Sequence, residues 1–110
     1  MPQVTDKKII DKWKEEHDVK NIEELKVERV SEDGKNKEYF FAYAKRPTIQ
    51  VLGLVKKFEE SDPAKSWEIL YDNTKIVADP EIEADEELKM AVIIQMTKIF
   101  THHEVEVKKL

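Results

Sequence analysis

The chain has 110 residues, and its 24 acidic side chains outnumber 19 basic ones to give a net charge of −5. This length fits one domain of ordinary size, so we predict a single domain over residues 1–110. The absence of cysteine excludes disulfides, cysteine-based zinc sites and thiol catalysis. The acidic balance argues against a nucleic-acid partner, because such proteins place positive charge opposite the phosphates.

The first predicted element is a helix near the N-terminus. Thr5 or Asp6 can cap it, and apolar side chains at helical spacing between Ile9 and Trp13 carry it to about His17. The remaining positions are mostly charged, which is typical of a solvated helix that lies on a larger body.

A short helical turn and a β-hairpin should come next. Asn21 with Glu24 has the spacing of a capping box, which predicts the turn over residues 22–25. Residues 27–30 and 38–45 have the composition of strands, and the Asp-Gly pair between them is a strong turn signal. Because an isolated hairpin is marginally stable in water, it should lie on the helices or add to another sheet.

Two helices are predicted after the hairpin. Thr48 can cap the first, which should break near Ser61. The Asp-Pro pair at 62–63 opens the second, because it places a capping residue before proline at the first helical position. This second helix should run to about Tyr71 and end with Asn73 in a left-handed conformation.

A connection, a long helix and a tail complete the chain. Residues 74–84 form the connection, and the three acids that begin at Asp85 favour a helix start there, with the helix ending at about Thr101. Residues 102–110 alternate valine with charge and form either an edge strand or a flexible tail. The fold class is therefore α+β: a mostly helical small single domain with an N-terminal helix, a β-hairpin and about three further helices.

No targeting or membrane-spanning segment is expected. Residues 1–20 lack the apolar run of a secretory signal. The longest apolar run, residues 90–94, is far shorter than the roughly 20 residues that a spanning helix needs. We therefore expect a cytoplasmic protein with no membrane partner.

The residues that could carry chemistry favour neither catalysis nor metal binding. The acidic run at 79–87 lacks the glycine and the regular ligand spacing of a calcium loop. His102 and His103 are adjacent and point to different faces, unlike the spaced histidines of zinc hydrolases. No serine lies in a glycine-flanked elbow. We predict that the protein is not an enzyme and has no cofactor; a small metal-dependent protein is a further alternative.

Two apolar segments predict a partner-binding surface. The last helix is apolar around most of its circumference, so it is either the central helix of the core or an interface on one face. The aromatic strand leans apolar on both faces, so it is either covered or takes up a partner. The residues expected to bind a partner are Phe41, Tyr43, Met90, Ile93, Ile94 and Phe100.

A series of short motifs runs through residues 38–100. Lys-Arg-Pro-Thr follows the aromatic strand at 45–48, Asp-Pro pairs stand at 62–63 and 79–80, and Asp-Glu-Glu-Leu at 85–88 leads into the apolar last helix. This series resembles the tail assembly chaperones of long-tailed bacteriophages and prophages, in which similar motifs recur around short helices. Residues 38–100 are a little over half of the chain.

The resemblance implies a small acidic protein that leaves before the phage tail is finished. Residues 1–37, a less family-like N-terminal extension and first strand, lie outside it. Chaperones of this family coat the tape-measure protein and recruit tail-tube subunits. The expected function is thus a non-enzymatic tail assembly chaperone that binds these phage proteins in the bacterial host cytoplasm. A small structural tail or head-completion subunit, self-assembling as a homo-oligomer, is the alternative.

Overall fold

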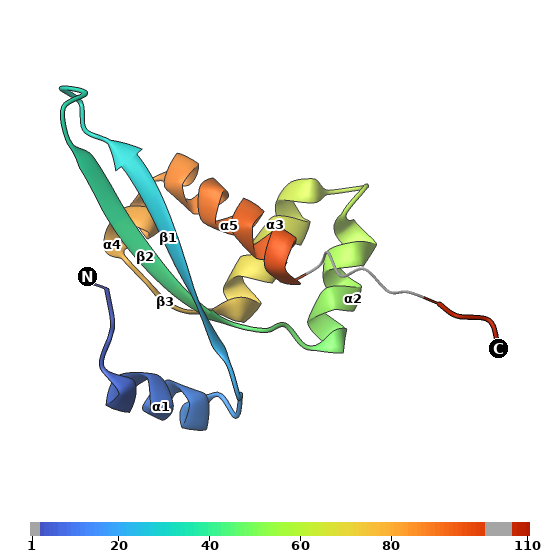
Figure 1. Ribbon diagram of the computed structural model, residues 1–110. Helices are drawn as coiled ribbons and strands as arrows, with labels where there is room; N and C mark the ends of the chain where they lie inside the picture. The colour runs from blue at the N-terminus through green and yellow to red at the C-terminus, as the bar shows by residue number, and fades with distance from the viewer. Residues whose placement is uncertain (1–2, 101–106) are drawn as a thin grey trace.

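The computed structural model describes residues 3–100 and 107–110. In chain order, the elements within them are α1 (Lys7–Glu16), β1 (Ile22–Val30), β2 (Lys37–Lys45), α2 (Ile49–Phe58), α3 (Pro63–Thr74), β3 (Lys75–Ala78), α4 (Pro80–Ala84) and α5 (Glu86–Phe100). The predicted α+β class is confirmed. Figure 1 shows the long β1-β2 hairpin with α5 and α3 beside it, α1 at its lower end and α2 farthest from it.

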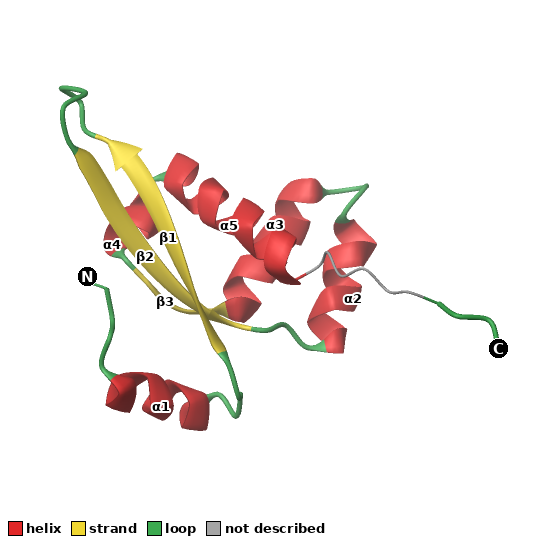
Figure 2. Cartoon of the chain, in the orientation of Figure 1, coloured by secondary structure: helices red, strands yellow, loops and turns green. Residues whose placement is uncertain are grey.

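The three strands form one antiparallel sheet in the order β1-β2-β3 (Figure 2). The β1 and β2 strands pair without interruption, from Ile22 opposite Lys45 to Val30 opposite Lys37. The short β3 strand pairs with the second half of β2, and the register shifts between Tyr43 and Ala44. The hairpin thus gains both the further strand and the helical cover that its stability requires.

The hairpin turn is built around the predicted Asp-Gly pair. Gly34 has a φ of 70°, a left-handed conformation that glycine adopts without a side-chain clash. Its N–H donates to the carbonyl of Ser31 at 2.8 Å, and the Ser31 N–H donates to the carbonyl of Asn36 at 2.8 Å. The Asp33 carboxylate accepts hydrogen bonds from the Ser31 hydroxyl and from the Lys35 N–H, which lower its pKa.

The predicted helix starts are confirmed by their caps. The side chains of Asp6, Thr48 and Asp62 each accept a hydrogen bond from a backbone N–H in the first turn of α1, α2 and α3. Asp85 does the same at the start of α5, where its Oδ1 accepts from the N–H of Glu87 at 2.9 Å. These bonds satisfy backbone donors that no helical carbonyl can reach.

Three local predictions are wrong. Residues 22–25 are the first part of β1, because pairing with β2 satisfies their backbone in place of a capped turn. Asn73 stays inside α3 and donates from Nδ2 to the carbonyl of Ile69 at 2.8 Å, so it does not end the helix in a left-handed conformation. The connection at 74–84 contains an additional strand and an additional helix, β3 and α4.

The core lies between the sheet and the helices. Its buried residues come from β1, β2 and four of the helices, with α5 contributing more of them than any other element. They are Leu25, Ala42, Ala44, Val55, Leu70, Tyr71, Ile82, Leu88, Val92, Ile93, Met96 and Phe100. Burial of their apolar surface is the main force that holds the sheet and helices together.

The opposite face of the sheet is covered at one end by the N-terminal segment. The Tyr43 ring lies 5.3 Å from the Trp13 ring of α1, centre to centre. The Val4 N–H donates to the Tyr43 hydroxyl at 2.6 Å, and that hydroxyl donates to Glu24 at 3.2 Å. Burial raises the pKa of Tyr43, and the Glu24 carboxylate acts in the same direction. Because α1 itself has no buried residue, it is held by few contacts.

Asp79 joins α4 to the middle strand. Its side chain is 1% exposed, and its Oδ2 accepts from the N–H of Phe41 at 2.7 Å. Its own N–H donates to the carbonyl of Phe41 at 2.9 Å. This pair of bonds continues the β2-β3 pairing beyond the end of β3 and fixes where α4 begins.

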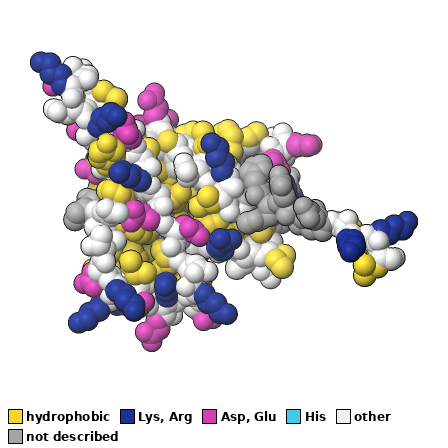
Figure 3. All heavy atoms as spheres, viewed as in Figure 1, with side chains coloured by type: hydrophobic (Ala, Val, Ile, Leu, Met, Phe, Trp, Pro, Cys, Tyr) yellow, Lys and Arg dark blue, Asp and Glu magenta, His cyan; other side chains and the backbone are white. Residues whose placement is uncertain are grey.

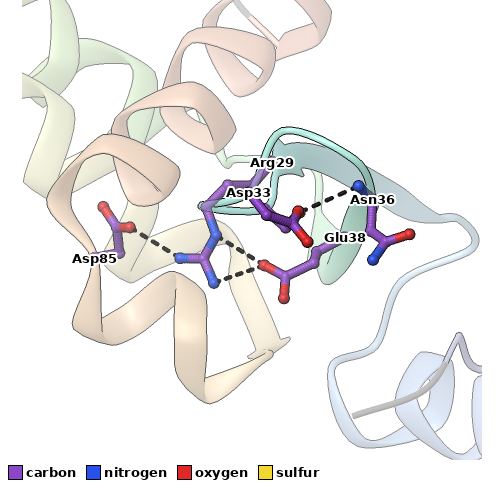
Figure 4. A network of polar contacts seen from close by, with 6 residues as sticks. Arg29, Asp33, Asn36, Glu38 and Asp85 are labelled. Carbon is purple, nitrogen blue, oxygen red and sulfur yellow. Dashed lines mark hydrogen bonds and ion pairs between the residues drawn. The ribbon is translucent and has the colours of Figure 1, made fainter.

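Arg29 joins the hairpin to the start of α5 (Figure 4). Its Nε and Nη2 donate to Glu38 Oε2 at 3.1 and 3.0 Å, and its Nη1 lies 3.3 Å from Asp85 Oδ2. The guanidinium also lies over the Phe40 ring, 5.0 Å from its centre. The contacts with Glu38 and then with Asp85 raise the pKa of Arg29.

The C-terminal predictions lie largely outside the described residues. This holds for the helix end at Thr101, for His102 and His103, and for most of the tail at 102–110. Residues 107–110 have no secondary structure and are exposed. In the part of the chain that the structure describes, no helix is both long and apolar enough to cross a bilayer.

Candidate partner-binding site

The six residues predicted to bind a partner divide into two groups. Phe41, Tyr43, Ile93 and Phe100 are all less than 9% exposed, so their side chains are occupied by packing within the chain. Ile94 is 47% exposed, and Met90 is half-buried. Only α5 therefore retains predicted residues that can contact a partner in this conformation.

A surface hollow lies where α3, α4 and α5 meet. Its volume is about 370 Å³, and its lining residues are Ala64, Trp67, Glu68, Glu83, Glu86, Lys89, Met90 and Ile93. We call it the α3/α5 hollow. Hydrophobic side chains gather at the surface over α3 and α5 on the face that Figure 3 shows.

Two helices position the apolar part of the α3/α5 hollow. On α3, Leu70 and Tyr71 point into the core, which leaves Trp67 at the edge with 37% of its surface exposed. On α5, Met90 lies in the hollow, and Ile94 follows it by one helical turn on the same side of the helix. The apolar surface thus rests on two helices that the core holds in place.

Trp67 is the site residue that the sequence pattern did not single out. Helical spacing groups it with Ala64, Leu70 and Tyr71 on one apolar stripe, and that stripe predicts core. In the fold, Leu70 and Tyr71 are buried, whereas Ala64 and Trp67 are exposed. At the start of α3, the α2 helix covers the side of Ser66, and no described element covers the side of Ala64 and Trp67. The only usable signal was the tryptophan itself, a residue common at binding hot spots.

A charged cluster closes one end of the hollow. Lys75 Nζ lies 2.6 Å from Glu83 Oε1, and the ammonium groups of Lys75 and Lys89 lie 5.4 and 4.7 Å from the centre of the Tyr71 ring. Burial raises the pKa of Glu83, but the bond to Lys75 and the further contacts outweigh it, so the pKa is lowered. Burial, and then the Glu83 charge, raise the pKa of Tyr71.

The rim of the hollow carries an excess of negative charge. Glu83 is neutralised by Lys75, and Lys89 lies over the Tyr71 ring. Glu68 and Glu86, by contrast, form no ion pair within residues 3–100 and 107–110. The rim therefore favours a partner that presents lysine or arginine beside its apolar surface.

A second hollow of about 310 Å³ lies by the hairpin turn. Arg29, Val30, Ser31, Glu32 and Glu38 line it. Its surface is largely polar, and its arginine is already engaged by Glu38 and Asp85. It offers a partner less apolar surface than the α3/α5 hollow does.

The described residues show no arrangement typical of a metal centre. Within residues 3–100 and 107–110, no group of three or more histidines, aspartates or glutamates could hold a metal ion. His102 and His103 fall outside these ranges, so the predictions about them stay predictions.

Comparisons with protein-family models, with curated proteins and with solved structures find no match. The motifs that resemble tail assembly chaperones all fall at corners of the fold. Residues 45–48 join β2 to α2, the Asp-Pro pairs open α3 and α4, and Asp85 opens α5.

Proposed function

We propose that this protein is a non-enzymatic assembly chaperone that holds an apolar helical segment of a partner against the α3/α5 hollow. The observation that carries the proposal is the exposure of Trp67, which lines the hollow together with Met90 on two helices fixed by the core. Ile94 is exposed one helical turn beyond Met90. A helix laid in a groove with its apolar face inward is a common mode of protein recognition.

The chemistry of these side chains suits such a partner. Tryptophan supplies a large, rigid contact area and is enriched among residues that dominate binding energy. Methionine is flexible and polarisable, so Met90 can adapt to apolar side chains of different shape. Glu68 and Glu86 can pair with basic residues that flank the partner's apolar face. The partner expected from this chemistry is a basic amphipathic helix.

The motif resemblance supports a more specific form of the proposal. A phage or prophage tail assembly chaperone in the bacterial host cytoplasm would bind the tape-measure protein, which is long and helical, together with tail-tube subunits. A tape-measure protein would supply many apolar helical segments of the required kind. The net charge of −5 would help to keep a protein with exposed apolar surface from aggregating through that surface.

A pull-down from the native host lysate, with mass spectrometry of the captured proteins, tests this function. Tagged wild-type protein should recover a very long helical protein and tail-tube subunits, and Trp67→Ala should lose both. Ile49→Ala is the matched control, because Ile49 is apolar and 86% exposed but lies on α2, outside the hollow.

Circular dichroism and thermal unfolding establish whether each variant is folded. Ile94→Glu provides a second test on α5, where the exposed side chain can be changed without altering the core. Equal recovery of the tail proteins by wild type, Trp67→Ala and Ile94→Glu would contradict the proposed site. Recovery of the protein itself alone, as a defined ring, would favour the structural subunit.

A further inference from the structure

We propose that two copies of this chain pair through the free edges of their β1 strands, antiparallel to each other, to form one continuous sheet. The β1 strand is at the edge of the sheet, and no other element in the described part of the chain pairs with its outer side (Figure 2). An edge strand presents unpaired backbone N–H and C=O groups that a second strand can satisfy.

The hydrogen bonds within the sheet identify which β1 residues face outward. Phe41 bonds through its N–H and C=O to Asp79, on the β3 side, so its even-numbered neighbours on β2 bond to β1. The bond from the Ser31 N–H to the Asn36 carbonyl agrees with this alternation. The β1 residues whose backbone points to the free edge are Ile22, Glu24, Lys26, Glu28 and Val30.

Side-chain charge selects one register for the second strand. Backbone pairing requires an outward-pointing residue opposite another one. If each Lys26 lay opposite Lys26 of the partner subunit, each Glu24 would lie opposite Glu28 of the partner subunit. All the charged pairs formed by outward-pointing residues would then repel. With Val27 on the two-fold axis, each Lys26 lies opposite Glu28 of the partner subunit, and both charge pairs attract. This second register also places two apolar valines side by side at the centre.

One other register would also pair opposite charges, and the contacts of Glu24 disfavour it. With Leu25 on the axis, Lys26 would face Glu24 of the partner subunit. The Glu24 carboxylate, however, already accepts hydrogen bonds from Tyr43 and from Gln3 of the N-terminal segment. Among the described residues, the Glu28 side chain has one ion pair, with Lys37 at 3.5 Å, and both side chains are well exposed. Glu28 is therefore freer to meet a second chain.

The same charges limit association to this one arrangement. Charged side chains on an edge strand prevent indiscriminate pairing, because most registers bring like charges together. Alternating charge along β1 leaves a self-complementary register open. Since β1 contributes no residue to the α3/α5 hollow, the two proposed interfaces share no lining residue.

Charge reversal tests the pairing without touching the core. Lys26→Glu places two glutamates opposite each other across the axis, and Glu28→Lys places two lysines there. Each single variant should weaken dimerisation about tenfold or more in Kd, because two attractive pairs become repulsive. The double variant K26E/E28K restores both pairs and should return the wild-type Kd. Sedimentation equilibrium over a range of concentrations measures these constants.

The controls separate this interface from other causes. Lys26 lies over the Tyr39 ring at 4.2 Å, so circular dichroism must show that the single variants stay folded. Glu68→Lys, on the rim of the α3/α5 hollow, changes the net charge as Glu28→Lys does and should leave the dimer unchanged. A monomer at every concentration would overturn the proposal. So would a dimer that is indifferent to the single reversals, or one in which only Lys26→Glu weakens it.

Discussion

Single side chains connect segments of this domain that are distant in sequence. Asp79 bonds through both its side chain and its backbone to Phe41, and Arg29 links β1 to β2 and to the first turn of α5. Glu83 has a comparable position on α4, where it accepts from Lys75, whose ammonium group lies over the Tyr71 ring of α3. Charge at these points therefore contributes to the tertiary structure and not only to solubility.

Glu83 is a residue at which acid should weaken the fold. Burial raises the pKa of its carboxyl, but the bond to Lys75, the Lys75 charge and the further contacts together outweigh burial and hold the pKa below its ordinary value of 4.5. A carboxyl with a lowered pKa in the folded state stabilises the fold above its unfolded-state pKa. That contribution is lost as the pH falls through the folded-state pKa. Glu83→Gln should therefore lower the free energy of unfolding at pH 7 by about 1 kcal/mol or less.

Urea unfolding of wild type and Glu83→Gln at pH 7 and pH 3 measures this contribution. The two proteins should differ less at pH 3 than at pH 7, because the contribution of the Glu83 charge falls as the pH approaches and passes its pKa. Glu81→Gln is the control, because Glu81 is on the same short helix but is exposed and forms no ion pair in the described part of the chain. A loss of stability that is equal at both pH values would contradict the role of the Glu83 charge.

At the scale of whole elements, the two glycines should respond to alanine in opposite directions. Gly34 in the hairpin turn has a φ of 70°, and an added Cβ would meet no atom within 4 Å. Gly34→Ala should therefore cost about 1 kcal/mol from backbone strain alone. Gly53 lies inside α2, where an added Cβ also meets nothing within 4 Å. Gly53→Ala should stabilise the protein by up to about 1 kcal/mol, because alanine favours the helix.

Thermal unfolding monitored by circular dichroism distinguishes these two effects. Gly34→Asn is the matched control for the turn, because asparagine tolerates the left-handed conformation better than alanine. It should restore most of the stability that Gly34→Ala loses. A fall in Tm for Gly53→Ala would show that α2 is not packed as described.

The elements that the sequence predicted are those with local signals. A capping side chain begins α1, α2, α3 and α5, and the Asp-Gly turn defines the hairpin, so nearby residues suffice to locate them. The β3 strand has no such signal, and α4 begins with an Asp-Pro pair whose aspartate does not cap the helix but bonds to Phe41. Their positions depend on pairing with β2 and on the bonds between Asp79 and Phe41, which join residues far apart in the chain.

The candidate site was only partly predictable for a similar reason. An apolar strand or helix face can be buried or exposed, and the sequence does not say which neighbour will cover it. Phe41 and Tyr43 are buried, whereas Ile94 and Trp67 are left at the surface by the arrangement of α3 and α5. The apolar composition of α5 predicted that part of its surface could be exposed. Which of its residues are exposed depends on how the helices pack.

The whole molecule combines two proposed interfaces that do not overlap. The α3/α5 hollow takes a helical segment, and the β1 edge takes a second copy of the chain. A dimer would therefore present two identical hollows, one in each copy, and the helices that form them would pack on one continuous sheet. A long partner with repeated apolar helical segments could occupy both, and the second contact would form at a high effective concentration.

This geometry predicts that dimerisation controls the affinity for a two-site ligand. A peptide with one basic amphipathic helix should bind wild type and Lys26→Glu with the same Kd, because Lys26 is outside the hollow. Two such helices joined by a flexible linker long enough to reach both hollows should bind wild type about a hundredfold more tightly than one helix. Lys26→Glu should abolish that gain at concentrations where the variant is monomeric. Isothermal titration calorimetry measures each Kd. A gain that persists in monomeric Lys26→Glu would mean that both helices bind a single chain, and the dimer would then have no part in recognising the partner.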